Sequence, residues 1–333
     1  MKNICPICVK KISESLAPYN DIGWTDFGIF KKLQLSHCSH CGFGFSVPEL
    51  DEGTVGYFYE KQYRSKGSTF HIDFSKLKYN DGVRDIRSSR SFAQLTLARV
   101  FCKFENQDIF LDVGPGLGGS FKLAVALFEK PKLYAIELSE GASEYYKNSY
   151  NVICDSSLDD FISSGQKAQI ILMSHSLEHY RVSDLPKLML SLYSALDDNG
   201  VIVVEVPNDD LRFHLKNRGV DTPHFLFFSE ESLALLFQKN SFEVLFIDTC
   251  GEEYLDANEL LASELSSSTI KTYLKDIFNN FSSPIQNFLG SLVRTFRKIK
   301  NFKLIVKINP TFSLPNQSYG GERNSIRMVI RKK

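Results

Sequence analysis

The chain lacks several features that would place it in a special class of protein. No apolar run approaches the roughly 20 residues that a helix needs to cross a bilayer. The first residues, Met1 to Pro6, contain no apolar stretch of the kind found in secretory signals. Gly and Pro number only 20 and 11 among 333 residues, and 43% of the residues are hydrophobic, which excludes collagen-like and wholly disordered chains. We therefore expect a cytoplasmic globular protein with one large domain or two ordinary ones.

Net charge is absent as well, but the charges are unevenly distributed. The 39 Lys and Arg residues balance 39 Asp and Glu residues over the whole chain. From Leu260 to Lys333, however, there are thirteen basic and three acidic residues, so this segment carries +10 and the first 259 residues carry −10. A basic end on an acidic body predicts either an anionic partner (a phosphate, a membrane surface or a nucleic acid) or a solvated basic face.

Cysteine is scarce, and the odd total of seven argues against complete disulfide pairing. Four of the seven form two Cys-x-x-Cys pairs, Cys5 with Cys8 and Cys38 with Cys41, separated by 29 residues. Tight turns of this kind aim two thiolates at one ion, and two turns complete the tetrahedral shell that Zn²⁺ prefers. The spacing predicts a structural zinc site with no open position. A neighbouring His could replace one thiolate, and the alternative is two unrelated buried pairs.

The most informative segment begins with a short apolar run that contains an acid, Ile109 to Val113. The sequence Gly-Pro-Gly-Leu-Gly-Gly follows at residues 114–119, and apolar residues with helical spacing continue from Phe121 to Phe128. A strand, a glycine loop and a helix in this order are typical of nucleotide binding, because glycines let the backbone approach the ligand at the helix N-terminus. A Walker loop is excluded because no Gly-Lys-Ser/Thr follows.

This pattern, with Asp112 two residues before the first glycine, resembles the class I S-adenosylmethionine-dependent methyltransferases. The resemblance covers residues 105–250 and includes similarity of Leu177-Glu178-His179 and Val206-Pro207-Asn208 to family signatures. It implies an α/β fold with a Rossmann-like, seven-stranded methyltransferase sheet, completed by a last strand near residues 325–330. It also implies S-adenosylmethionine as the methyl donor.

The resemblance assigns roles to strand-end residues. It implies that Glu137 holds the ribose hydroxyls and that Asp155 contacts the adenine. The residues implied for the cofactor site are Asp112, Gly114, Gly116, Gly118, Glu137, Asp155, Ser156 and Ser174.

The zinc module in front of such a domain is similar to that of bacterial sugar methyltransferases. This implies a small, anionic acceptor, a nucleotide-linked sugar or a glycan of surface polysaccharide or natural-product biosynthesis. Two alternatives stay open. One is O-methylation of a quinone or another natural-product hydroxyl, and the other is a non-catalytic scaffold that binds a partner through its basic insertion.

Four residues are candidates for the acceptor side of the site: His175, Glu178, His179 and His224. An oxygen or carbon nucleophile must lose a proton, and a His near neutral pKa suits that task. Three interpretations remain: a His acting as general base with Glu178 orienting it, a divalent metal held by these groups, or a purely structural cluster. His175, Glu178 and His179 would share one face if the stretch is helical.

We expect a zinc-binding module at 1–50, a linker and helix at 51–104, the methyltransferase domain at 105–250, a helical basic insertion at 251–322 and the last strand and tail at 323–333. The insertion contains an amphipathic basic helix within 284–307, which predicts a lid or a dimer surface, attachment to anionic lipid, or nucleic-acid binding. Nucleic acid is the least favoured, because the rest of the chain is acidic. Tyr59 and Tyr63 are predicted to pack between modules or to contact substrate.

Overall fold

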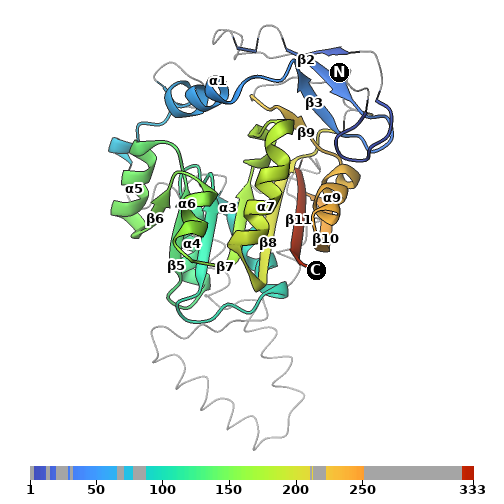
Figure 1. Ribbon diagram of the computed structural model, residues 1–333. Coiled ribbons are helices and arrows are strands. Elements are labelled where there is room, and N and C mark those ends of the chain that lie inside the picture. The colour runs from blue at the N-terminus through green and yellow to red at the C-terminus, as the bar shows by residue number, and fades with distance from the viewer. Residues whose placement is uncertain are drawn as a thin grey trace, which may run out of the picture.

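The computed structural model describes residues 4–12, 16–19, 29–30, 33–65, 71–77, 88–210, 212, 223–250 and 325–333. Its centre is a seven-stranded sheet with the order β10-β11-β8-β7-β4-β5-β6 (Figure 1). All neighbouring pairs are parallel except those of β11, which is antiparallel to both β8 and β10. The predicted fold class is confirmed. The strands are β4 (Ile109–Val113), β5 (Lys132–Ile136), β6 (Ile153–Asp155), β7 (Ala168–Ser174), β8 (Leu196–Pro207), β10 (Phe242–Cys250) and β11 (Ser325–Lys332).

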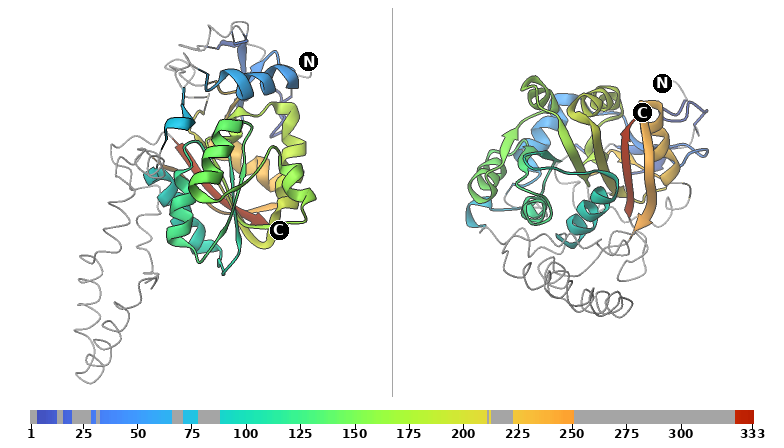
Figure 2. Two further views of the ribbon diagram at one scale, coloured as in Figure 1. Left: turned by 90° about the vertical axis from the view of Figure 1, so that its left-hand side faces the viewer. Right: turned by 90° about the horizontal axis from the view of Figure 1, so that it is seen from below.

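Helices cover both faces of this sheet (Figure 2). Strand residues alternate between the faces, so Phe110 packs in one apolar cluster and Leu111 in the other. The first cluster includes residues of α3 (Ser88–Phe101), α4 (Gly119–Leu127) and α5 (Glu140–Tyr150). The second includes residues of α6 (Leu158–Ser163), α7 (Leu185–Ala195) and α9 (Glu230–Lys239). Because both faces are covered, the parallel strands are apolar along nearly their whole length.

The chain changes direction across the sheet between β4 and β7. It runs from β4 outward through β5 to β6, and then returns to the other side of β4 with β7 and β8. At such a switch point the loops after neighbouring strands diverge and leave a crevice at the carboxyl ends of the strands, where ligands bind in open α/β sheets. The order of the strands therefore places the glycine loop after β4 beside the Leu-Glu-His turn after β7.

A second sheet joins the N-terminal residues to the central domain. Its order is β1-β2-β3-β9, with β1 at Ala17–Pro18, β2 at Gln34–His37, β3 at Gly44–Val47 and β9 at Leu226–Phe227. Strand β9 comes from the loop beyond β8, and it pairs antiparallel with β3. The two modules thus share a sheet, and the boundary near residue 50 stays a prediction.

The chain crosses from the N-terminal sheet to the site through helix α1 (Glu52–Tyr57) and the π-helical turn η2 (Phe58–Gln62). The Asp51 carboxylate caps α1 by accepting from the Thr54 amide at 2.9 Å. A π-helical turn is rare and is often found at functional sites. It is followed by a 3-10 turn, η3 (Phe74–Lys76).

The predicted insertion at 251–322, including the basic helix within 284–307, lies outside the described residues. Within the part of the chain that the structure describes, no helix combines the length and the apolar character needed to span a bilayer.

Candidate active site

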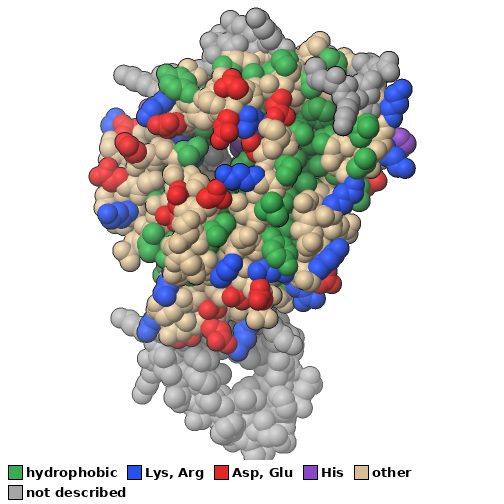
Figure 3. All heavy atoms as spheres, viewed as in Figure 1, with side chains coloured by type: hydrophobic (Ala, Val, Ile, Leu, Met, Phe, Trp, Pro, Cys, Tyr) green, Lys and Arg blue, Asp and Glu red, His purple; other side chains and the backbone are tan. Residues whose placement is uncertain are grey.

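A cavity of about 910 Å³ lies at the carboxyl ends of β4, β5, β7 and β8, beneath α1 and η2. Figure 3 looks onto this face of the molecule, where acidic and basic side chains gather around a hollow. The volume lies at the upper end of the range for small-molecule sites, so there is room for two ligands side by side. One side of the lining comes from the glycine loop and Glu137, and the other from His175, His179 and His224.

The glycine loop adopts a backbone conformation that side chains disfavour. Gly114, Gly116 and Gly118 have φ angles of +76°, +65° and +73°. A Cβ atom on Gly116 would meet nothing within 4 Å, so this backbone borders open cavity. A Cβ atom on Gly118 would lie 3.0 Å from the ring of Tyr146, so Gly118 permits packing of α4 against α5 and does not line the cavity.

Two carboxylates flank the glycine loop. Asp112 accepts a hydrogen bond from the Ser120 hydroxyl at 2.5 Å, while its Oδ1 is buried without a hydrogen-bond partner among the described residues. Burial raises the pKa of Asp112 to about 7, although the Ser120 hydrogen bond opposes this shift. Glu137 follows β5, and its Oε1 accepts from the Ser139 amide at 2.9 Å. The unpaired oxygen of Asp112 and the carboxylate of Glu137 both border the cavity and can accept from a ligand.

Most residues predicted for the cofactor do line this cavity. Gly118 and Asp155, both well within the described chain, lie outside the lining, and a cofactor contact for either of them stays a prediction. The predicted residues that do line it are Asp112, Gly114, Gly116, Glu137, Ser156 and Ser174.

The residues predicted for the acceptor side come together, but on a 3-10 turn, η4 (Leu177–His179), and not on one helical face. His175 precedes this turn with a left-handed φ of +52°. Its Nδ1 lies 3.3 Å from Glu178 Oε1, and His224 Nε2 lies 3.8 Å from the same oxygen. Burial favours a neutral carboxyl, but the surrounding imidazoles, His175 first, lower the pKa of Glu178 to about 2. Glu178 is therefore a buried anion among three imidazoles.

The tautomer of His179 follows from its neighbours. The Tyr59 hydroxyl lies 2.7 Å from His179 Nδ1 and donates to the Pro223 carbonyl oxygen at 2.9 Å. Since the hydroxyl has one proton, His179 must carry its own proton on Nδ1 for all three atoms to be hydrogen-bonded. The neutral ring then has its lone pair on Nε2. Burial lowers the pKa of His179 and raises that of Tyr59 well above its usual value, which keeps the ring neutral and the phenol protonated near pH 7.

A family model described as a methyltransferase domain matches residues 86–246, a little under half of the chain. The chain carries a methyltransferase domain. The protein is therefore an S-adenosylmethionine-dependent methyltransferase, which is the enzyme class predicted from the sequence. No curated protein matches it.

Solved structures similar to this methyltransferase include the cyclopropane synthase MmaA2 from Mycobacterium tuberculosis, with 13% identity, a TM-score of 0.44 and coverage of 72% of this chain and 82% of that one. Another is a SAM-dependent methyltransferase from Archaeoglobus fulgidus, with 16% identity, a TM-score of 0.38 and coverage of 73% and 94%.

Sequence reasoning missed a buried charge network behind the methyltransferase site. Glu205 on β8 is 1% exposed, and its carboxylate accepts from Arg327 Nε at 2.5 Å and Gln94 Nε2 at 2.9 Å. The same Gln94 amide donates to the Ser174 hydroxyl at 2.8 Å. His175 Nε2 lies 3.6 Å from Glu205. Burial and the charge of Arg90 lower the pKa of His175, but its two carboxylate neighbours outweigh them, so the net shift is upward.

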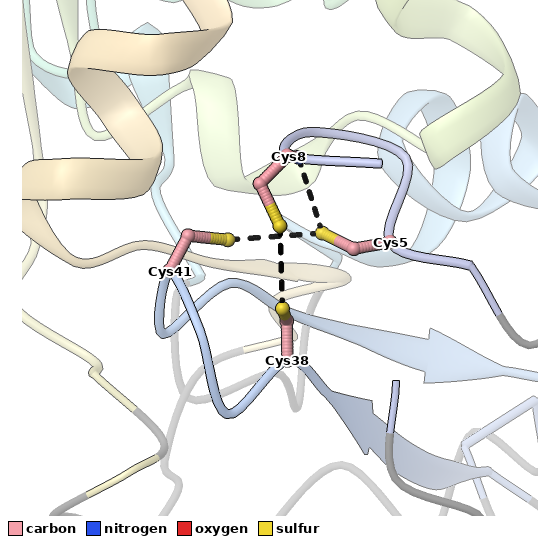
Figure 4. A group of neighbouring side chains, drawn as sticks. All are labelled: Cys5, Cys8, Cys38 and Cys41. Carbon is pink, nitrogen blue, oxygen red and sulfur yellow. Dashed lines mark hydrogen bonds between the residues drawn. The ribbon is translucent and has the colours of Figure 1, made fainter. Parts of the chain in front are cut away.

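The four cysteines predicted to bind zinc in the methyltransferase lie together, with their sulfur atoms pointing inward (Figure 4). Cys5 and Cys41 Sγ are 3.7 Å apart, and Cys8 and Cys38 Sγ are 3.4 Å apart. Tetrahedral Zn–S bonds of about 2.3 Å place sulfurs about 3.8 Å apart, so the cluster fits a zinc ion with small adjustments. Gly42, at φ +73°, turns the second knuckle tightly enough for its amide to donate to the Cys38 carbonyl at 2.9 Å.

Proposed function

We propose that this methyltransferase transfers a methyl group to an oxygen or carbon of a small acceptor, most simply a nucleotide-linked sugar or a glycan. The observation that carries the proposal is that one cavity is lined both by a glycine loop with strand-end carboxylates and by His179, whose Nδ1 is hydrogen-bonded to Tyr59. A methyl donor and an acceptor can therefore lie side by side, as direct transfer requires. The sugar class rests on the resemblance of the paired cysteines and the central domain to sugar methyltransferases.

The chain's residues fit the donor through three features. Gly116 gives access to the backbone, Asp112 offers an unpaired buried oxygen, and Glu137 offers a carboxylate at the end of the next strand. S-adenosylmethionine supplies a methyl group bound to a positively charged sulfur. We assign Glu137 to the ribose hydroxyls and the loop at 114–116 to the methionine part, with Ser156 and Ser174 at the two ends.

On the acceptor side, His179 is the general base. Its Nδ1 proton is fixed by Tyr59 and Pro223, so Nε2 is free to take the proton of the acceptor. The Glu178 carboxylate stabilises the imidazolium that forms, because it lies in the same cluster as His179 and His224, with one ligand atom of each within 4.8 Å. His175 lies between Glu178 and Glu205, which favours its protonated form and a positioning role.

The acceptor class can be tested directly with mass spectrometry. Purified protein is incubated with S-adenosylmethionine and, separately, with nucleotide-linked deoxysugars, a soluble quinol and simple natural-product phenols. The expected result is a single added methyl group on a nucleotide sugar. Methylation of the quinol or phenol alone would contradict the sugar assignment and favour the alternative acceptor.

A divalent metal at Glu178, His179 and His224 is a second candidate, because both oxygens of Glu178 are buried without a hydrogen-bond partner among the described residues. Carboxylate and imidazole ligands suit several transition metals. If His179 is a base, a brief incubation with chelator should leave kcat within about twofold, since proton transfer needs no ion. Loss of turnover that returns with added Mg²⁺ or Mn²⁺, while zinc stays bound by elemental analysis, would favour the metal.

We also propose that Cys5, Cys8, Cys38 and Cys41 hold one structural zinc ion. Because these residues pack in the same apolar cluster as α7 and α9, losing the ion should destabilise more than the N-terminal residues. Cys38→Ser is expected to lower zinc content below half of one ion per chain and to lower the melting temperature. The matched control is Cys154→Ser, a half-buried cysteine outside the cluster. A folded, reduced protein without zinc by elemental analysis would end this proposal.

A further inference from the structure

Arg64 follows η2, two residues after its end, and borders the cavity, yet none of the roles above uses it. Its side chain is 18% exposed, and its Nη1 is buried with no hydrogen-bond partner among the described residues. The nearest carboxylate oxygen, Glu137 Oε2, is 3.9 Å away, which is too far for a hydrogen bond. Arg64 is thus a half-buried cation with at least one donor nitrogen, Nη1, that is not hydrogen-bonded among the described residues.

The groups around Arg64 do not offer it a paired acceptor. Glu137 Oε1 accepts from the Ser139 amide. The Tyr146 hydroxyl donates its proton to the Gly116 carbonyl at 2.5 Å, and its single oxygen is the only other acceptor beside Arg64 among the described residues. Another arginine of the cavity lining shows the contrast, because Arg181 makes paired contacts with both oxygens of Asp184. A guanidinium is a planar fork that matches the two oxygens of a carboxylate or phosphate.

Aromatic side chains hold the Arg64 guanidinium in place without consuming its donors. Its Cζ lies 5.2 Å from the centre of the Phe74 ring and 6.0 Å from that of Tyr63. Tyr63 in turn contacts the ring of His179, with centroids 6.0 Å apart. The guanidinium is therefore preorganised between Glu137 and the proposed base.

Arg64 and Arg90 border different parts of the cavity. Arg64 lies beside Glu137 at the end of β5, whereas Arg90 contacts Glu205 on β8 at 3.3 Å. Strands β4 and β7 lie between β5 and β8, so the carboxylates that the two arginines approach belong to strands that are not neighbours in the sheet. A ligand oxyanion at Arg64 is therefore beside Glu137, the carboxylate that we assign to the ribose.

From this arrangement we infer that Arg64 recognises an oxyanion of the acceptor, a phosphate or carboxylate, and so selects anionic acceptors. The inference rests on the proposed function, because Glu137 and His179 define which end of the cavity is which. The same oxyanion chemistry could come from the methyl donor, so the test must separate the two sources.

Calorimetry with three probes makes this separation in the full chain, using the parent protein, Arg64→Gln and Arg64→Lys. The probes are inorganic pyrophosphate with S-adenosylhomocysteine present, S-adenosylhomocysteine alone, and 5′-methylthioadenosine, which lacks the carboxylate. We expect Arg64→Gln to lower the affinity for pyrophosphate about ten- to a hundredfold, the range for loss of a charge-assisted hydrogen bond. Arg64→Lys should restore part of the affinity for pyrophosphate. The dissociation constant for S-adenosylhomocysteine should stay within about threefold of the parent value in both variants.

The control is Arg331→Gln, because Arg331 is an exposed arginine on β11 paired with Glu243. Equal pyrophosphate affinity in the parent and in Arg64→Gln, or no binding to the parent, would overturn the inference. The inference would also be overturned if Arg64→Gln bound S-adenosylhomocysteine more weakly than the parent but bound 5′-methylthioadenosine equally well. That result would assign Arg64 to the carboxylate of the methyl donor. Failure of the parent to bind S-adenosylhomocysteine would instead refute the proposed function. In that case, titration with pyrophosphate in the absence of S-adenosylhomocysteine would still show whether Arg64→Gln weakens binding of the oxyanion.

Discussion

Gly116→Val is expected to reduce the affinity for S-adenosylhomocysteine by roughly a hundredfold or more. Gly116 has a φ of +65°, and a Cβ atom there would enter open cavity. A β-branched side chain would occupy the space that the ligand needs and would also strain the backbone by about 1–2 kcal/mol. Calorimetric titration measures the loss of binding, and a thermal melt shows whether the variant is folded.

Gly165→Val is the matched control for that variant. Gly165 has a φ of +74° and also has nothing within 4 Å of an added Cβ atom, but it lies outside the cavity lining. Gly165→Val should lose about as much stability as Gly116→Val and should bind S-adenosylhomocysteine with the affinity of the parent. If Gly116→Val binds S-adenosylhomocysteine as the parent does, the methyl donor lies elsewhere and the glycine loop has only a structural role.

His179→Ala is expected to lower kcat by about 10²–10⁴-fold, the usual contribution of a general base. The dissociation constant for S-adenosylhomocysteine should stay within about threefold, because His179 belongs to the acceptor side. Tyr59→Phe should have a smaller effect on kcat, since it removes only the hydroxyl that orients the ring. Steady-state kinetics on the best acceptor, with calorimetry in parallel, measures both quantities.

The pH profile provides an independent test of the same residue. The base works in its neutral form, and burial lowers the pKa of His179 below its usual value near 6.5. Activity should therefore be lost as the pH falls through this lowered pKa, and kcat/KM should already be near its plateau at pH 7. A profile whose acidic limb persists in His179→Ala, with kcat within about threefold, would show that another group is the base.

The central sheet was predictable because each of its parallel strands carries a local signal. Ile109 to Val113 is a continuous apolar run next to a glycine loop, and this combination leaves few alternatives to a buried parallel strand. The helices at 185–195 and 230–239 show apolar residues at helical spacing. Periodicity and loop chemistry therefore determine these elements before any long-range contact forms.

The contacts that complete the site were not predictable, because they join residues with no local relation. Tyr59 and His179 are separated by 120 positions, and Glu205 and Arg327 by 122. Strand β9 has two residues and exists only because β3 is there to pair with it. The stretch at 175–179 does not form one helix, because His175 takes a left-handed backbone and the 3-10 turn that follows is only three residues long.

Transfer of a labelled methyl group tests the central claim most directly. The protein, loaded with S-adenosylmethionine that carries a labelled methyl group, is mixed with excess nucleotide sugar and quenched within one turnover. If donor and acceptor share the cavity next to His179, the label should move to the sugar and form an equal amount of S-adenosylhomocysteine, and His179→Ala should hold the donor but transfer it at least about a hundredfold more slowly. Tight binding of the donor with no transfer to any acceptor would contradict this account and would identify the chain as a scaffold.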